Sequence, residues 1–227
     1  GRARHRRIAA IQQEVGLAMA RPRSDIEPRI IHAARRRFLE DGVDGASLRN
    51  IARDAGTNIG MIYYYFPTKD DLFLAVVEEI YAKVLAQLEE AIEQEVSFEA
   101  RVSAIYARVG ALGADELDVM RLVVRESIAS SARLERLIER FKRGHIGLML
   151  RAVAEGLGSG QLDPRFHPAV MVMSTFALGI APQMIRRIAA DRMAFLGLPD
   201  GPAFAKQLVE VLLHGIARPA SPSENPP

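Results

Sequence analysis

Residues 47–72 read SLRNIARDAGTNIGMIYYYFPTKDDL, and this stretch sets the frame for the rest of the chain. Apolar side chains recur at helical spacing in two short runs, which predicts two helices joined by a tight turn. The two runs are Leu48, Ile51, Ala52, Ala55 and then Ile59, Ile62, Tyr63, Phe66. Gly56 is expected to end the first helix and Pro67 the second.

Polar residues stand where these helices should begin. Ser47 and Asn58 precede the two apolar runs and are predicted N-caps. Thr68, with Asp71 three residues later, resembles a capping box for a third helix. Lys69 would then lie in the first turn of that helix, where free backbone N–H groups favour an anion such as a phosphate.

The outer face of the second short helix carries no charge. If Ile59, Ile62 and Phe66 point inward, the outer residues are Asn58, Gly60, Met61, Tyr64 and Tyr65. Hydroxyls, an amide and a glycine that allows close approach suit the major groove of DNA. The alternative is that all three tyrosines belong to a core, but three consecutive helical residues cannot face one side.

Charge and composition agree with a DNA-binding N-terminal part. Residues 1–69 hold 13 basic and 7 acidic residues, a net +6, whereas residues 70–227 hold 17 and 21, a net −4. This asymmetry favours a polyanionic partner for the first third, although a solvated basic surface would have the same composition. The absence of cysteine excludes disulfides and thiolate sites and fits a reducing cytoplasm, where we expect the protein to act.

The pattern Ala52-x-x-Ala55-Gly56-x-x-x-Gly60-x-Ile62-Tyr63-x-x-Phe66-x-x-Lys69-x-x-Leu72 resembles the DNA-binding signature of TetR/AcrR-family transcriptional regulators. The likeness covers roughly residues 28 to 75. It implies an all-α chain with an N-terminal three-helix helix-turn-helix DNA-binding domain and a C-terminal helical ligand-binding and dimerisation domain. It also implies a repressor that a small molecule releases from a palindromic operator.

Nine residues are predicted to contact double-stranded DNA. Those assigned to the DNA backbone are Ser47, Thr57, Asn58, Tyr63, Tyr65 and Lys69. Those assigned to base reading are Gly60, Met61 and Tyr64.

We expect four segments along the chain. They are a basic N-terminal extension (1–23), the helix-turn-helix domain (24–71), the helical domain (72–217) and a disordered tail (218–227). The extension is open to three interpretations: an arm that contacts DNA, a loosely ordered tail, or an Arg-rich transit peptide. A signal peptide is not expected, because Gln12, Gln13 and Glu14 interrupt any apolar run.

The third helix is predicted to continue to about residue 94. Five further helices are expected at 97–112, 115–130, 133–156, 167–190 and 201–217, with no alternating strand pattern. Residues 168–185 are almost wholly apolar, so a transmembrane helix is the alternative to a packed one. The family resemblance implies instead that the helices near 167–190 and 201–217 form a homodimer interface, with no membrane contact.

The chain carries no recognisable catalytic or metal-binding motif. The glycine-rich run 156–160 follows a helix and lacks phosphate-loop spacing, and no two histidines stand at i, i+4. We therefore predict no enzyme, no cofactor and no metal. The family resemblance implies a small-molecule pocket among the middle helices, with candidate residues Met120, Arg121, Arg125, Phe141, His145, Met149, Met173 and Phe176. The alternative interpretation is that these are ordinary core and surface residues without a ligand.

Two alternative functions stay open at this point. One is an all-α small-molecule carrier or enzyme whose helix-turn-helix is structural. The other is a membrane-surface protein that uses the basic residues 1–23.

Overall fold

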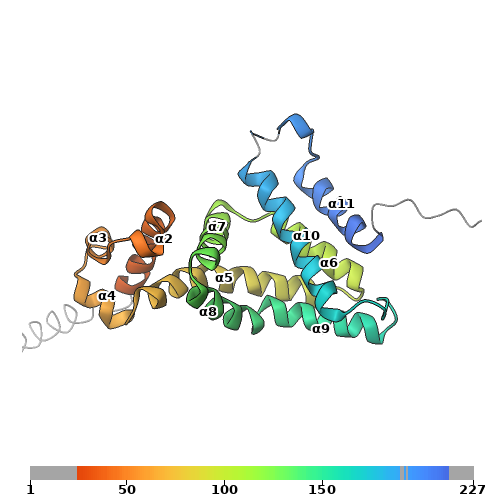
Figure 1. The fold of residues 1–227 in the computed structure, drawn as a ribbon, viewed down its shortest axis with the longest axis horizontal. Coiled ribbons are helices and arrows are strands. Elements are labelled where there is room, and N and C mark those ends of the chain that lie inside the picture. Colours follow the sequence, from red (N-terminus) through yellow and green to blue (C-terminus); the bar gives the residue numbers. More distant parts are fainter. Residues whose placement is uncertain (1–24, 190–191, 193, 215–227) are drawn as a thin grey trace, which may run out of the picture. The chain divides into compact units, whose positions relative to one another are not determined.

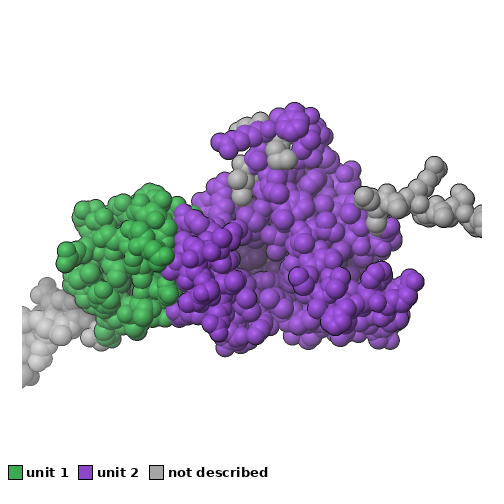
Figure 2. All heavy atoms as spheres, viewed as in Figure 1, with its two compact units in different colours: residues 1–76 green, residues 77–227 purple. Residues whose placement is uncertain are grey.

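The computed structural model describes residues 25–189, 192 and 194–214. The described part consists of helices, turns and loops, without a strand, so the all-α prediction is confirmed. The chain divides between Val76 and Val77 into two compact units (Figure 2). The predicted N-terminal extension and C-terminal tail lie outside the described residues.

The first unit is a three-helix head around a small apolar core. Its elements are α2 (Ile26–Gly45), α3 (Leu48–Asp54), α4 (Ile59–Tyr65) and the start of α5 (Lys69–Glu93). Ile30 and Phe38 of α2, Ile51 of α3 and Ile62 of α4 are each at most 1% exposed. The short helices α3 and α4 are therefore held by this shared core, because seven-residue helices are not stable alone.

A glycine shapes the turn between α3 and α4. Gly56 has a φ of 64°, in the left-handed region that costs glycine least. Its N–H donates to the carbonyl of Arg53, and the next N–H donates to the carbonyl of Ala52. The predicted end of the first short helix at this glycine is confirmed.

The second unit contains the remaining helices (Figure 1). They are the rest of α5, α6 (Phe98–Gly110), α7 (Ala114–Ala129), α8 (Ser131–Lys142), α9 (His145–Gly158), α10 (Pro168–Ile188), the 3-10 turn η2 (Ala194–Leu196) and α11 (Gly201–His214). Within this unit α6, α10 and α11 pack against one another.

One predicted helix is wrong. The expected single helix 133–156 is two helices, α8 and α9, separated at Gly144. Gly144 has non-helical angles, φ −119° and ψ −125°, and a side chain there would collide with the hydroxyl of Tyr81. The break thus lies beside Tyr81 of α5, which leaves no room for a side chain at 144, and helical periodicity cannot reveal a contact so distant in sequence.

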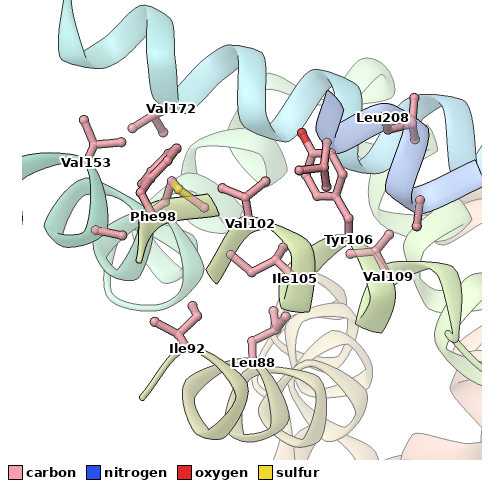
Figure 3. Packing of buried hydrophobic residues seen from close by; sticks show 14 of the residues in the cluster. Leu88, Ile92, Phe98, Val102, Ile105, Tyr106, Val109, Val153, Val172 and Leu208 are labelled. Atoms are coloured by element: carbon pink, nitrogen blue, oxygen red, sulfur yellow. The ribbon is translucent and has the colours of Figure 1, made fainter. Parts of the chain in front are cut away.

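The core of the second unit centres on α6 (Figure 3). Val102 and Tyr106 of α6 are fully buried. The Tyr106 hydroxyl donates a 2.8 Å hydrogen bond to the carbonyl of Thr175, and the ring lies directly against Gly179. Both contacts fix α6 to α10, and the absence of a Cβ at Gly179 is what allows the tyrosine ring to approach.

Helix α10 has one covered and one uncovered face in the single chain. Thr175 and Gln183 are buried, whereas Val170, Met173 and Ile185 are 54%, 70% and 51% exposed. Among the described residues, Pro168–Arg187 is long and apolar enough to cross a membrane by length and composition alone. A single such helix is also what an amphipathic packing helix of a non-membrane protein looks like, so it is weak support for a membrane span.

Candidate DNA-reading surface and ligand cavity

The outer face of α4 presents aromatic side chains to solvent. Tyr64 is 71% exposed and Tyr63 is 52% exposed, whereas Ile62, which directly precedes them, is buried. Tyr65 is partly buried and meets the Tyr64 ring edge-on at 5.1 Å between centroids. The remaining predicted DNA contacts on this element divide into exposed Asn58 and Gly60 and partly buried Thr57 and Met61.

The two predicted N-caps form as expected and keep donors to spare. The Ser47 hydroxyl oxygen accepts from the backbone N–H of Asn50 at 3.5 Å, and Asn58 Oδ1 accepts from the N–H of Met61 at 3.1 Å. Each cap uses an acceptor. The hydroxyl hydrogen of Ser47 and the amide hydrogens of Asn58 therefore remain chemically suited to a phosphate oxygen.

The start of α5 shows the predicted reciprocal capping box. The N–H of Thr68 donates to Asp71 Oδ2 at 3.0 Å, and the N–H of Asp71 donates to the Thr68 hydroxyl at 3.1 Å. Lys69 next to it donates from Nζ to the carbonyl of Asp44 at 3.0 Å. An ammonium has three donors, so this bond aims the lysine and leaves two donors for DNA.

An acidic residue at the end of α3 gathers several arginines. Asp54 accepts from Arg37 Nε at 2.7 Å and Nη2 at 2.6 Å, and from Arg36 Nη2 at 3.3 Å. The hydrogen bonds from Arg37 hold the pKa of Asp54 below its usual value, although burial opposes this. This cluster ties α2 to α3 and orients the short helix pair; no local sequence pattern predicts it.

The second unit encloses an apolar cavity of about 230 Å³. Figure 2 shows a hollow in this unit, where α5, α7 and α10 come together in the view of Figure 1. Five of the predicted ligand residues line the cavity: Met120, Phe141, His145, Met149 and Phe176.

Three predicted ligand residues do not line the cavity. Met173 is 70% exposed on the uncovered side of α10. Arg121 and Arg125 follow one another at i, i+4 on the outer side of α7, where Arg121 pairs with Asp118 at 3.4 Å and Arg125 with Glu126 at 3.2 Å. Sequence alone places a residue on α7 but does not say which side faces the cavity.

The charged side chains that line the cavity are paired with each other. Arg108 forms an ion pair with Glu116 and also donates from Nε to Gln87 at 2.6 Å. Burial alone would raise the pKa of Glu116, but the hydrogen bonds from Arg108 and from the backbone of Gly113 keep it below its usual value. Both charges are therefore compensated, and the remaining wall is almost wholly apolar.

A second polar contact in the cavity joins α5 to the start of α9. The Tyr81 hydroxyl lies 2.9 Å from Nδ1 of His145 and accepts from the backbone N–H of His145 at 3.1 Å. Burial lowers the pKa of His145 to about 4, and the charge of Arg140 acts in the same direction. Tyr81 was not predicted; it is 64 residues from its partner, and no local pattern links the two.

These features define a class of protein. A helix pair with an exposed, uncharged aromatic face, attached in sequence to a helical unit with an apolar cavity, is the arrangement of a helix-turn-helix DNA-binding regulator. Residues 30–76 match the family described as "Bacterial regulatory proteins, tetR family". The likeness to TetR/AcrR-family transcriptional regulators that the signature predicted is confirmed over this segment.

Relatives and solved structures agree with the family. The fatty acid metabolism regulator protein of Bacillus subtilis (strain 168) is 24% identical over 133 residues, which span 59% of this chain and 69% of the relative. The structure of FadR from Bacillus subtilis in complex with stearoyl-CoA matches with a TM-score of 0.68 at 18% identity, over 83% of this chain and 98% of that one.

A third match has DNA in its crystal. The structure of AibR in complex with isovaleryl coenzyme A and operator DNA matches with a TM-score of 0.62 at 15% identity, over 83% of this chain and 98% of that one. At this level of identity the structural matches show the fold. Because the family is a class of regulators, the prediction that the chain is not an enzyme is confirmed, and the carrier or enzyme alternative is not supported.

Proposed function

We propose that this regulator represses transcription from a palindromic operator and is released by a small molecule that binds in the cavity of the second unit. The observation that carries the proposal is the exposed face of α4, where Tyr63 and Tyr64 stand on a helix whose start is capped by the Asn58 side chain. A rigid, solvent-facing aromatic surface without charge suits base edges more than it suits a protein core.

The residue roles follow from this placement. Tyr64, Gly60 and Met61 read bases; the phosphate contacts come from Ser47, Thr57, Asn58, Tyr63, Tyr65 and Lys69. The spare donors on the capping side chains and on Lys69 support the phosphate roles, because backbone contacts set register without carrying sequence information.

The proposal includes a homodimer through α10 and α11. The exposed apolar side chains of α10 would be covered by the same helix of a second copy, which would remove the need for a membrane or another partner. Two heads on a two-fold axis would reach half-sites roughly 34–36 Å apart, about one turn of DNA. Such a protein works where the DNA is, in the bacterial cytoplasm.

The effector we propose is an acyl thioester or another compound with an apolar chain. The cavity wall supports this, since its charged side chains are already paired and the rest is apolar. Two matched proteins were solved with coenzyme A thioesters, stearoyl-CoA and isovaleryl coenzyme A. Effector binding would favour a state whose heads do not match the operator, by as much as its affinities for the two states differ.

The first experiment is selection of bound duplexes from a random DNA library, followed by titration of the selected duplex with and without a series of acyl-CoA chain lengths. We expect a palindrome with half-sites one turn apart. If the effector's affinities for the two states differ by about 3 kcal/mol, operator binding should weaken roughly 150-fold. Tight binding without sequence preference would contradict the specific repressor, and an affinity that no thioester changes would contradict the proposed effector class.

A further inference from the structure

His145 is a polar side chain on the described cavity wall whose hydrogen-bonding atoms are not all occupied by described protein partners. Its described polar contacts all go to the Tyr81 hydroxyl, through Nδ1 at 2.9 Å and the backbone N–H at 3.1 Å. No described residue bonds to Nε2. The ring is otherwise surrounded by aromatic rings: Phe141 at 4.8 Å, Phe176 at 5.0 Å and Tyr81 at 5.6 Å between centroids.

The hydrogen bonds favour one placement of the imidazole proton. A backbone N–H can only donate, so the Tyr81 oxygen accepts from His145 N. The tyrosine's own hydrogen then has Nδ1 as its acceptor among the described residues. Nδ1 must be unprotonated to accept it, and a neutral imidazole therefore carries its hydrogen on Nε2.

Three features keep the imidazole neutral. It is largely removed from water, it stands in the first turn of α9, where the positive end of the helix dipole disfavours a cation, and Arg140 is close by. Arg140 is itself held by two hydrogen bonds to Glu78, at 2.6 and 2.7 Å, and lies over the Tyr81 ring. It does not line the cavity, so it offers no free charge to a ligand there.

We infer that His145 presents a neutral Nε2–H donor to the cavity and selects effectors whose buried part carries one uncharged acceptor, such as a ketone, ester or thioester carbonyl. This inference rests on the proposed role of the cavity as the effector site. A free carboxylate is disfavoured because its charge would have to leave water without a cation to meet it. A plain hydrocarbon fits the wall but leaves the donor without a partner.

Gly144 and Tyr81 act as positioning residues for this donor. The hydroxyl can reach the backbone of residue 145 because residue 144 has no side chain, and a Cβ there would collide with it. The tyrosine in turn caps one of the free N–H groups at the start of α9. The donor is therefore oriented before any ligand arrives.

The test uses three probes of matched length: 2-octanone, its isostere 2-methyl-1-octene, in which a methylene replaces the carbonyl oxygen, and octanoate. Calorimetric affinities are measured for the wild-type protein, for His145→Phe and for Val123→Ala, an apolar variant elsewhere on the cavity wall. The alkene reports whether the cavity admits an apolar guest at all. The ketone-to-alkene affinity ratio reports the donor.

We expect that ratio to be roughly three- to tenfold higher in the wild-type protein than in His145→Phe, and unchanged in Val123→Ala. Equal ratios in wild-type and His145→Phe proteins would overturn the donor while leaving the cavity as a binding site. Tighter binding of octanoate than of 2-octanone would overturn the neutral class. If neither the ketone nor the alkene bound to wild-type protein, the inference and the proposed effector site would both fall.

A measurement on the wild-type protein guards against a variant that does not fold. The ¹⁵N chemical shifts of His145 distinguish a protonated from an unprotonated ring nitrogen. We expect a protonated Nε2 whose signal moves on addition of 2-octanone and stays in place on addition of 2-methyl-1-octene. A proton on Nδ1 would overturn the inference.

Discussion

The reading surface and the cavity treat polar side chains in opposite ways. In the head, the side chains of Ser47, Asn58 and Lys69 each form one hydrogen bond with the backbone and keep further donors available to solvent. In the cavity, the charges of Arg108 and Glu116 compensate each other, and His145 retains a single donor. Exposed donors cost little while unbound, because water serves them, whereas each unused buried donor costs stability. A reading surface can therefore hold many contacts in reserve, and a cavity can hold few.

The largest effect is expected from a substitution that removes part of the apolar core of the head. Phe38 is fully buried in α2, and Phe38→Ala should cost about 3–5 kcal/mol of folding free energy in the first unit. DNA binding should then be lost, while the second unit keeps its affinity for 2-methyl-1-octene. Gel-shift and calorimetric titrations measure the two separately. His32→Ala, exposed on the same helix, serves as the control and should change neither.

Acid should affect the cavity through His145. The folded pKa of about 4 lies below the ordinary 6.5 of the unfolded chain. Above pH 6.5 both states are neutral at this residue and stability is complete. Between pH 6.5 and 4 the imidazole is protonated in the unfolded chain but stays neutral in the folded chain. The free energy of unfolding therefore falls as pH falls, by about 2 kcal/mol at pH 5.

Urea unfolding of wild-type and His145→Phe proteins at pH 7, 6 and 5 isolates this contribution. The groups around the ring are Tyr81, Arg140 and Glu78, with Phe141 and Phe176. The variant should lose less stability than the wild type over this range. Parallel curves would mean that the imidazole takes up its proton at an ordinary pH in the folded state.

Removing a base-reading side chain should change preference more than stability. Tyr64 is 71% exposed, so Tyr64→Ala should alter folding by no more than about 0.5 kcal/mol. Affinity for the selected operator should fall about tenfold, and repeated selection should return a relaxed sequence at one position of each half-site. Tyr63→Ala is the matched variant, and it should lower affinity for all duplexes alike. An unchanged selected sequence for Tyr64→Ala would mean that the reading face is misassigned.

The smallest effect is expected at the start of α5. Lys69→Ala removes one phosphate contact and the bond to Asp44, so affinity should drop uniformly across sequences. The slope of log affinity against log salt should fall by about one unit for each protein subunit's lost contact. An unchanged slope would assign this lysine to the head's own structure and not to DNA.

The same contrast explains what sequence could predict. The head was readable because its signals are local: caps three residues from their partners, a turn glycine, and apolar residues at helical spacing all lie within residues 47–72. The buried positions Ile51, Ile62 and Phe66 followed from the same periodicity.

The second unit was predicted as helices, and its cavity was expected only from the family resemblance. Its helix count failed at Gly144, where the chain breaks beside Tyr81, a residue far away in sequence. The cavity residues named in advance were chosen by type. That choice found His145 on the wall but also included Arg121 and Met173, which point elsewhere. The Asp54 arginine cluster was missed for the same reason, since it joins residues 17 and 18 positions apart.

Gly144 has a consequence for how this protein can diverge. The same set of contacts is lost if residue 144 gains a side chain, if residue 81 lacks its hydroxyl or if residue 145 is replaced. We therefore expect the three positions to change together in evolution. Among descendants of a common ancestor, glycine at 144 should be found together with tyrosine at 81 and histidine at 145. Proteins in which one of these three residues is replaced should also have replacements at the other two and should respond to a different class of effector. Their operator-reading residues should vary independently of these three.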